Sequence, residues 1–328
     1  MNSTIQTKNR IDEIDLCRVL CILWIVGFWH MYKSFPKTLY PSTSTIYYMS
    51  LITDVVLACF TFLSGFLLKR YSFYTWFDIK TFYKKRFWRF FVLFSIASLA
   101  IFVIYYRSSE YLPHLFSTLL GFSLITSTTM WSMWYFSMLI LFYFVTPMVL
   151  WKDSLLRKIV VSVTLFVIFE LMVLYAGSDI RLVYYFPFYT LGLILPNVFF
   201  THILKKRVFF VISMFFLILL VFAGFYNYLS DLYLFKLLLM LFGVFTIIGS
   251  CFIIYKPSMQ NVVRWGGYSS MCVFLFHRPI LEIFHMLFGE RLSILTIILL
   301  VAVYFAAGFA IQKIYDIIMA KILIHQKY

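Results

Sequence analysis

Long apolar runs follow one another along almost the whole chain, and this feature restricts the possible fold most. Residues 237–254 form one such run of 18 residues without a charge. Apolar stretches of roughly this length are typical of membrane-spanning helices. Because 63% of the 328 residues are hydrophobic and only 12% are charged, a water-soluble globular fold is excluded. The pattern predicts a polytopic membrane protein.

The spans are predicted to be helices rather than the strands of a barrel. The apolar runs lack the ten-residue alternation of membrane barrels, and a helix satisfies its own backbone hydrogen bonds in lipid. We predict an all-α polytopic membrane helix bundle, a single integral membrane domain over residues 1–328 with about ten transmembrane helices. The expected spans cover residues 16–35, 46–68, 88–106, 131–151, 159–176, 182–200, 208–227, 232–254, 267–288 and 292–319.

The distribution of basic residues predicts the topology. The net charge is +15, but the Lys and Arg residues lie in short clusters between apolar runs, so no nucleic acid partner is expected. Residues 108–130 are only moderately apolar and can form an eleventh span, or an interfacial or re-entrant segment. An eleventh crossing would move Lys205, Lys206 and Arg207 outside. The positive-inside rule therefore favours ten spans with both termini cytoplasmic.

No metal site is expected from the sequence. Glu282 and His285 have a spacing that can bind a metal, but no third ligand is evident. Neither disulfide pairing nor closely spaced metal ligation is indicated for the cysteines. All five fall inside or at the edges of apolar runs, namely Cys17, Cys21, Cys59, Cys251 and Cys272.

Charges inside a bilayer are costly and therefore mark candidate functional residues. Asp15 and Arg18 are three residues apart at the start of the first span, so they can pair on one helical face. His30 follows Arg18 by 12 residues, which places it about 18 Å further along the helix and past the bilayer midplane. We predict a catalytic role for His30, with Asp15 and Arg18 organising the site. The alternative for His30 is a histidine that only packs between helices.

A second candidate site precedes the third span. Arg86 and Arg89 are three residues apart, and each guanidinium can bind phosphate oxygens bidentately. They are the expected cofactor-binding residues for a phosphate-bearing donor. Basic residues at a cytoplasmic helix end are also an ordinary topology and lipid-headgroup signal, and the sequence is compatible with both interpretations.

The ninth span supplies a second deep histidine. His277 lies about 15 Å into that span, a depth at which it can orient an acceptor or support His30. A structural histidine beside a kink at Pro279 is the alternative. The next residue, Arg278, is expected to snorkel or to pair with Glu170 or Asp54.

Two aromatic residues at the outer end of the fourth span complete the candidate residues. Trp134 and Tyr135 can stack on a sugar ring, although a position in an aromatic membrane belt also explains each of them. With His277 they form the expected substrate-binding set.

The order of these motifs resembles the membrane acyltransferase-3 family. Asp15, Arg18 and His30 are similar to the first helix of that family, and the resemblance extends over nearly the whole chain. The other similar segments are, in order, residues 62–66, 86–89, 133–137, 186–195 and 268–279.

The resemblance implies an integral membrane O-acyltransferase. Such an enzyme moves an acyl group, usually acetyl, from cytoplasmic acyl-CoA to a hydroxyl of a cell-surface or lipid-linked glycan, for example lipopolysaccharide O-antigen or capsule. Acetyl-CoA is then a donor substrate, and no cofactor is bound tightly. Ser64 and Gly65, within the motif at residues 62–66, join the expected donor-binding residues. The implied location is a bacterial inner membrane or plasma membrane, among membrane lipids.

One spacing differs from the family pattern. There the His follows the Arg by 11 residues, which returns it to within about 20° of the same face, whereas 12 residues leave His30 about 120° away. Either a π-bulge absorbs the additional residue, or His30 does not hold the family role. In that role His30 acts as a general base on the acceptor hydroxyl or carries the acyl group covalently, and the residues fit both.

Two other functions fit the same architecture. A transporter or flippase for a glycan or lipid-linked precursor also has many spans with buried charges, although the paired broken spans typical of carriers are not evident in the sequence. A structural or sensory membrane subunit would tolerate substitution of His30, Arg86 and Arg89.

Overall fold

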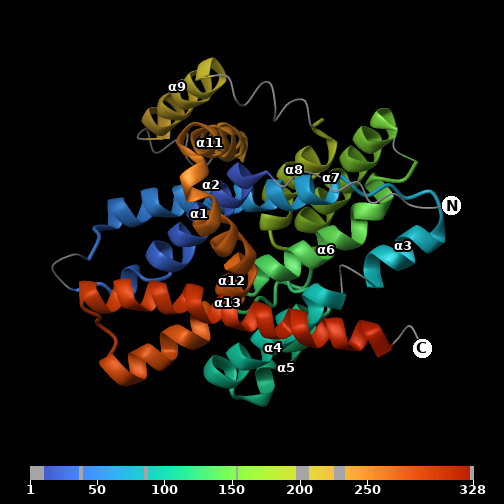
Figure 1. Ribbon diagram of the computed structural model, residues 1–328. Helices are drawn as coiled ribbons and strands as arrows, with labels where there is room; N and C mark the ends of the chain where they lie inside the picture. The colour runs from blue at the N-terminus through green and yellow to red at the C-terminus, as the bar shows by residue number, and fades with distance from the viewer. Residues whose placement is uncertain are drawn as a thin grey trace.

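The computed structural model describes residues 11–36, 40–84, 88–152, 154–196, 207–224 and 233–325. These ranges are helical apart from short connections, and their only β pairing is an isolated bridge between Phe73 and Trp151. The all-α prediction is confirmed (Figure 1).

Each expected span coincides with a helical segment. The α-helices are α1 (Asp12–Trp24), α2 (Thr43–Leu68), α3 (Trp76–Phe82), α4 (Trp88–Ile101), α5 (Leu112–Leu119), α6 (Trp134–Val149), α7 (Leu155–Ala176), α8 (Arg181–Ile194), α9 (Arg207–Gly224), α11 (Tyr233–Ile254), α12 (Gln260–Phe288) and α13 (Ile294–His325). Two π-helical segments, η1 (Ile25–Trp29) and η5 (Phe102–Tyr106), extend α1 and α4, and the short 3-10 segments are η2 (Tyr32–Ser34), η6 (Ser109–Tyr111) and η8 (Pro257–Met259).

The long helices are of membrane-spanning length. In the described ranges, five helical segments are long and apolar enough to cross a bilayer, and shorter apolar helices accompany them. The segment at residues 108–130 contains α5, which has eight residues. A helix of that size is about 12 Å long, so it is too short to cross a bilayer.

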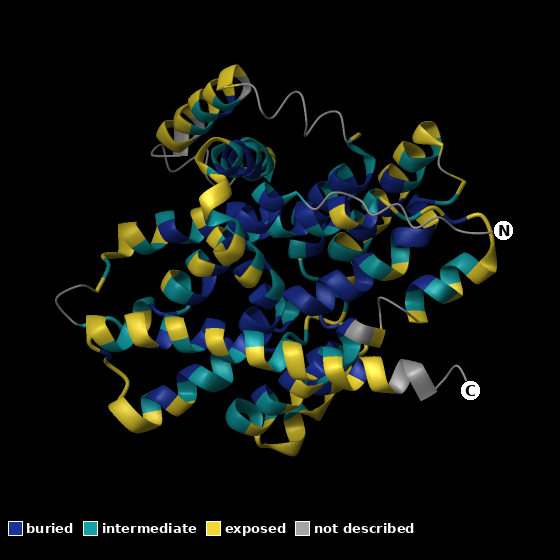
Figure 2. Cartoon of the chain, in the orientation of Figure 1, coloured by how far each residue is buried: buried dark blue, intermediate teal, exposed yellow. Residues whose placement is uncertain are grey.

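The bundle has central and peripheral helices. α2 packs against α1, α8 and α11, while α12 lies between α1 and α13. In its most apolar stretch 72% of α2 is buried, whereas the corresponding figures for α7 and α13 are 17% and 22%. Figure 2 shows the buried residues gathered in the middle of the bundle and the exposed ones along its outer helices. The outward apolar faces of α7 and α13 suit contact with lipid.

Two glycines bring α2 and α8 close together. A Cβ on Gly65 would collide with the Tyr189 carbonyl of α8, and a Cβ on Gly192 would collide with the Phe62 carbonyl of α2. Small residues at reciprocal positions let membrane helices approach backbone to backbone. This crossing fixes α2, which carries Ser64, against the rest of the bundle.

Candidate active site

The first helix changes its winding just before His30. α1 is a regular α-helix through Trp24, and η1 then continues it as a π-helix. The His30 N–H donates to the Ile25 carbonyl, five residues earlier, at 2.9 Å. The π-bulge that the 12-residue spacing required is therefore confirmed. It absorbs one residue, which returns His30 toward the face that carries Arg18.

His30 and His277 form a hydrogen-bonded pair. The distance from His30 Nδ1 to His277 Nε2 is 2.6 Å, and His277 Nδ1 lies 2.7 Å from the Phe274 carbonyl oxygen. A carbonyl can only accept, so His277 Nδ1 carries a proton and its Nε2 accepts from His30 Nδ1–H when both rings are neutral. This tautomer leaves the lone pair of His30 Nε2 available for an incoming proton.

Successive side-chain contacts join helices α1 and α12 along their length. From the start of α1 onward, Asp12 pairs with Arg264 at 2.7 Å, and Arg18 donates to Ser270 Oγ at 2.8 Å. The pair of His30 and His277 follows, and then Ser34 Oγ lies 2.9 Å from His285 Nε2. The two helices therefore run parallel, and their contacts hold the two histidines at one level of the bundle.

The first of these contacts lies before the apolar span. The Arg264 guanidinium hydrogen-bonds the Asp12 carboxylate and lowers its pKa to about 2, and further hydrogen bonds come from Gln260 and Tyr255. A carboxylate with several donors is favoured in its ionised form. Asp12 is thus a fixed negative anchor for α12.

A cavity of about 350 Å³ lies beside Arg18, and we call it the Arg18 cavity. Asp15 lies 3.3 Å from the Arg18 guanidinium. Gly267 leaves room for this acid, because a Cβ there would lie 2.8 Å from the Asp15 Cγ. The polar residues that line the cavity are Arg18, Ser64, Arg70, Tyr135, Tyr143, Ser270, Gln312 and Asp316.

A larger cavity of about 740 Å³ lies at the His30 end of α1, and we call it the Arg278 cavity. It combines aromatic rings with charged groups, a wall chemistry that suits carbohydrates. Its lining residues include Trp29, His30, Tyr32, Lys33, Ser34, Tyr105, Trp131, Ser132, Trp134, Arg181, Arg278, Glu282, His285 and Glu290.

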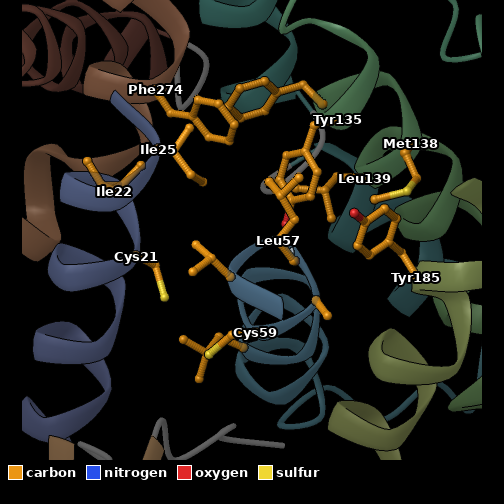
Figure 3. Close-up of a cluster of buried hydrophobic side chains, with 14 of the residues drawn as sticks. Cys21, Ile22, Ile25, Leu57, Cys59, Tyr135, Met138, Leu139, Tyr185 and Phe274 are labelled. Carbon is orange, nitrogen blue, oxygen red and sulfur yellow. Dashed lines mark hydrogen bonds between the residues drawn. The ribbon is translucent and has the colours of Figure 1, made fainter. Parts of the chain in front are cut away.

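The histidine pair lies between the two cavities. His30 lines the Arg278 cavity, whereas Phe274, whose carbonyl holds His277, lines the Arg18 cavity. The Phe274 ring contacts those of Tyr135 and Phe136, with centroid distances of 5.5 and 4.9 Å. Figure 3 shows Phe274 and Tyr135 facing each other across the space between α1 and α6. The Phe274 ring also lies 5.9 Å from the His277 ring, so an aromatic wall separates the Arg18 cavity from the histidine pair.

The structure divides the expected donor-binding residues. Ser64 lines the Arg18 cavity with Arg18, while Gly65 packs against α8. Arg86 lies outside the described residues. Arg89 lies in the first turn of α4, and its side chain is also outside the described part of the chain.

The expected acceptor-binding residues are also divided. Trp134 lines the Arg278 cavity, and its ring stacks on the Arg181 guanidinium at 4.1 Å. Tyr135 faces the Arg18 cavity instead, where its hydroxyl lies 3.1 Å from Thr61 Oγ1. His277 contacts His30 directly. Adjacent positions on one helix point in different directions, so Trp134 and Tyr135 cannot bind one sugar together.

The expected ion pairs of Arg278 are wrong. Its Nε–H donates to Ser132 Oγ at 3.2 Å, and in the described ranges neither Glu170 nor Asp54 is its partner. Asp54 instead accepts a hydrogen bond from the Tyr185 hydroxyl at 3.1 Å. Sequence alone could not supply this result, because it depends on which helices surround α12.

The structure brings together three cysteines for which the sequence indicated neither disulfide pairing nor metal ligation. The sulfur atoms of Cys17, Cys21 and Cys59 lie within 4.8 Å of one another, with Cys17 and Cys59 3.4 Å apart, and all three are fully buried. Cys21 and Cys59 face each other in Figure 3. The four-residue spacing of Cys17 and Cys21 was a signal for part of this cluster. Buried thiols behave as small apolar side chains, and here they fill the crossing of α1 and α2.

The pair of Glu282 and His285 also finds local partners. The Tyr105 hydroxyl donates to Glu282 at 3.1 Å, and Glu282 lies 3.8 Å from His285 Nδ1. Tyr105 belongs to the π-helical segment η5, so both π segments bring residues to the Arg278 cavity.

Several site residues were not recognised from the sequence. Ser270 binds Arg18, Gly267 accommodates Asp15, and the Phe274 carbonyl fixes the tautomer of His277. All three lie in the motif segment 268–279 or directly before it. The available signal was their helical spacing, at positions 267, 270, 274 and 277, which places them on one face of α12.

Comparison with known proteins adds a family assignment to this geometry. The family model described as an acyltransferase domain matches residues 11–312. No curated protein and no solved structure matches the chain. The match runs from the start of α1 to the middle of α13 and thus includes both cavities and the histidine pair. The chain belongs to the membrane acyltransferase-3 family.

Proposed function

We propose that this membrane acyltransferase moves an acetyl group from acetyl-CoA to a hydroxyl of a cell-surface or lipid-linked glycan such as O-antigen, capsule or another exopolysaccharide. The observation that carries the proposal is the hydrogen-bonded pair of His30 and His277 between two separate cavities. Two substrates that approach from opposite ends of α1 can meet at such a pair.

The donor occupies the Arg18 cavity in this proposal. Arg86 and Arg89, which precede and begin α4 in the sequence, bind the CoA phosphates. The acyl-bearing arm extends past Arg18 and Ser64 toward the aromatic wall. In this proposal both termini are cytoplasmic, because the basic loops then lie on the inner side of the membrane. The membrane itself is the bacterial inner membrane or a plasma membrane.

The acceptor occupies the Arg278 cavity, and His30 is the general base. Its Nε2 takes the proton of the acceptor hydroxyl while the hydroxyl oxygen attacks the thioester carbonyl carbon. The new C–O bond forms, the C–S bond breaks, and the proton passes from His30 to the departing thiolate. The products are an ester and CoA with a free thiol. His277 holds His30 in the tautomer that makes Nε2 the base.

The test compares the acyl content of purified surface glycans, by mass spectrometry, from cells that lack the gene and from cells restored with wild type or His30→Ala. The expected result is loss of an O-acetyl mass increment that wild type restores and His30→Ala does not. Normal membrane insertion of the variant is checked by immunoblot. Unchanged acetylation together with glycan accumulating inside the cell would contradict the proposal and favour a transporter.

The donor assignment has a separate test. Arg86→Lys keeps the charge but loses the bidentate geometry, so it is expected to raise the KM for acetyl-CoA in purified protein. An unchanged KM in both Arg86→Lys and Arg89→Lys would show that these residues do not bind the CoA phosphates.

A further inference from the structure

We propose that the acceptor is an acidic glycan whose carboxylate or phosphate binds Arg278 in the Arg278 cavity. The proposal rests on the proposed function, since it names the chemical class of the acceptor. Arg278 and His30 both line this cavity, so the acidic group binds near the histidine pair.

Among the described residues, Arg278 is a cation without an acidic partner. Its guanidinium lines the cavity, donates through Nε to Ser132 Oγ, and lies 5.7 Å from the centre of the Trp131 ring. In the part of the chain that the structure describes, no carboxylate oxygen lies within 4.0 Å of it. Its two terminal nitrogens make no described hydrogen bond and remain available to a ligand.

The other arginine of the cavity is already neutralised. Arg181 makes a bidentate pair with Asp179, with an Nε to Oδ1 distance of 2.8 Å. Burial alone would raise the pKa of the Asp179 carboxyl, but the hydrogen bonds from Arg181 outweigh it and lower the pKa. Of the two arginines that line the cavity, Arg181 therefore has a carboxylate partner among the described residues, whereas Arg278 has none.

The nearby acid on the same helix face, Glu282, contacts other residues. Glu282 lies one turn beyond Arg278, but it accepts from the Tyr105 hydroxyl at 3.1 Å and faces His285 at 3.8 Å. The arrangement keeps Glu282 from closing onto Arg278. A second acid of the lining, Glu290, lies beyond the end of α12 and is exposed.

The chemistry of the guanidinium explains why an anion is expected next to Arg278. A guanidinium stays protonated inside proteins, so Arg278 cannot escape its burial by losing charge. Cations within a membrane-embedded bundle are paired or face a functional path. The planar fork of a guanidinium matches the two oxygens of a carboxylate or the oxygens of a phosphate. An anionic ligand therefore supplies the neutralising charge that the protein lacks.

The walls of the cavity identify the rest of the ligand. Trp29, Trp131 and Trp134 line it together with Tyr32 and Tyr105, and such rings stack on the faces of sugars. A cation beside a group of aromatic rings selects a sugar that carries an acid. Because Arg278 adjoins the histidine pair, the acidic group lies on the acylated sugar or on its immediate neighbour.

Two sources provide the same anionic oxygens. One is the carboxylate of a sugar acid in the glycan, and the other is the phosphate that joins a sugar to a lipid carrier. Both place oxygen atoms for a bidentate contact with Arg278, and only a comparison of the two ligands distinguishes them.

The experiment measures ligand binding to the purified full-length chain in an uncharged detergent, without CoA, by quenching of tryptophan fluorescence. The probes are disaccharides with a glucuronic, galacturonic or mannuronic acid, their carboxyl-reduced neutral counterparts, and a sugar 1-phosphate. We expect at least one acidic probe to bind about tenfold more tightly than its neutral counterpart, with the difference decreasing at high salt. Preference for the uronic acids or for the sugar phosphate identifies the source.

Variants assign the effect to Arg278. Arg278→Gln is expected to reduce the ratio of acidic to neutral affinity to about one, and Arg278→Lys to retain part of it. Arg107→Gln is the matched control, because Arg107 is exposed, bonds its own helix at the Val103 carbonyl and does not line the cavity. The ratio of acidic to neutral affinity is measured in wild type itself, so the test still stands if a variant fails to fold.

The outcomes separate this inference from the proposed function. Equal binding of acidic and neutral probes by wild type, including binding of neither, overturns the inference. The same ratio in Arg278→Gln as in wild type also overturns it. If acidic sugars bind through Arg278 but no acetyl transfer to any glycan is found, the anion site stands and the proposed transfer fails. If transfer proceeds and Arg278→Gln lowers kcat alone, Arg278 acts on the reacting carbonyl and not on the acceptor.

Discussion

The two cavities at either end of the first helix differ in how Arg18 and Arg278 are neutralised and in how the helix that lines them is wound. Beside the Arg18 cavity α1 is a regular α-helix, and Arg18 has Asp15 and Ser270 as partners. At the Arg278 cavity the helix has become the π segment η1, and Arg278 contacts a serine hydroxyl and an aromatic ring but pairs with no carboxylate of the described residues.

This difference separates two tasks. A cation that is already paired with an acid helps to hold the helices in place, because a neighbouring side chain neutralises its charge. A cation without an acid and an irregular helical turn are both less stable arrangements, and proteins retain them mainly where a ligand or a reaction uses them. The contrast agrees with our proposal, in which the chemistry takes place at the His30 end of α1 and the Asp12 end anchors the helix.

The largest expected effect is at the junction of the two cavities. His30→Ala removes the proposed base and is expected to lower acetyl transfer by about 10²- to 10⁴-fold. Binding of acetyl-CoA should change little, because Arg18 and Ser64 remain. Transfer is measured by release of CoA thiol from purified protein, and binding by calorimetry. Near-normal transfer in a folded His30→Ala protein would show that acyl transfer between the two cavities does not require His30.

Changes in chain length test the winding difference itself. Deletion of Gly27 should convert η1 into regular α-helix while keeping His30 on its face, and transfer is expected to persist within about tenfold. Insertion of one alanine after Gly27 rotates His30 by about 100° and should abolish transfer as His30→Ala does. Equal activity in the deletion and insertion variants would indicate that the π segment does not set the direction of His30.

His277→Ala tests the positioning of the base. We expect kcat to fall by about 10- to 100-fold, the range typical of outer partners that orient a histidine, with the KM values for donor and acceptor unchanged. His114→Ala is the control, because His114 lies on α5 and lines neither cavity. A rise in acceptor KM without a fall in kcat would instead assign His277 to acceptor binding.

The anchoring side of the molecule is tested through stability. Gly65→Ala and Gly192→Ala force the α2 and α8 backbones apart and are expected to lower the free energy of unfolding by about 1–3 kcal/mol. Thermal unfolding in detergent measures this. Gly27→Ala is the control, since its Cβ would meet Val301 at an ordinary 3.4 Å. Equal stability of all three variants would show that the close crossing is dispensable.

The smallest effect concerns the contact of Asp12 with Arg264. The folded pKa of Asp12 is about 2, below the ordinary aspartate value of 3.8, so its stabilising contribution is complete above about pH 4 and is lost as the pH falls toward 2. Asp12→Asn removes this dependence. The thermal midpoint of wild type should therefore approach that of Asp12→Asn as the pH decreases through this window. Parallel curves for the two proteins would contradict the assignment.

Much of the architecture was predictable because it depends on local sequence. Apolar runs of span length must form helices in lipid, and each predicted span contains one. The pairing of Asp15 with Arg18 follows from their three-residue spacing. The π-bulge before His30 was one of the two alternatives that followed from the additional residue relative to the family spacing, and the structure decided between them.

The partners of the charged and polar residues were not predictable in the same way. Expected pairs of Arg278 with Glu170 or Asp54 did not form, and Trp134 and Tyr135 face different cavities. The sulfur cluster of Cys17, Cys21 and Cys59 arises because α1 crosses α2 at that level. Each result depends on which helices are neighbours and how they are rotated, and apolar periodicity carries little of that information in helices that are hydrophobic on all sides.

The sequence by itself determined that this chain is a helical membrane protein and that His30, Arg18 and Asp15 are exceptional within its first span. These properties follow from composition and from spacing along one helix. Only the tertiary structure decided that the helix changes its winding before His30, that His277 holds His30 through the Phe274 carbonyl, that an aromatic wall divides two cavities, and that Arg278 has no acid among its described neighbours. Contacts between helices distant in sequence depend on packing in three dimensions, which no single segment encodes.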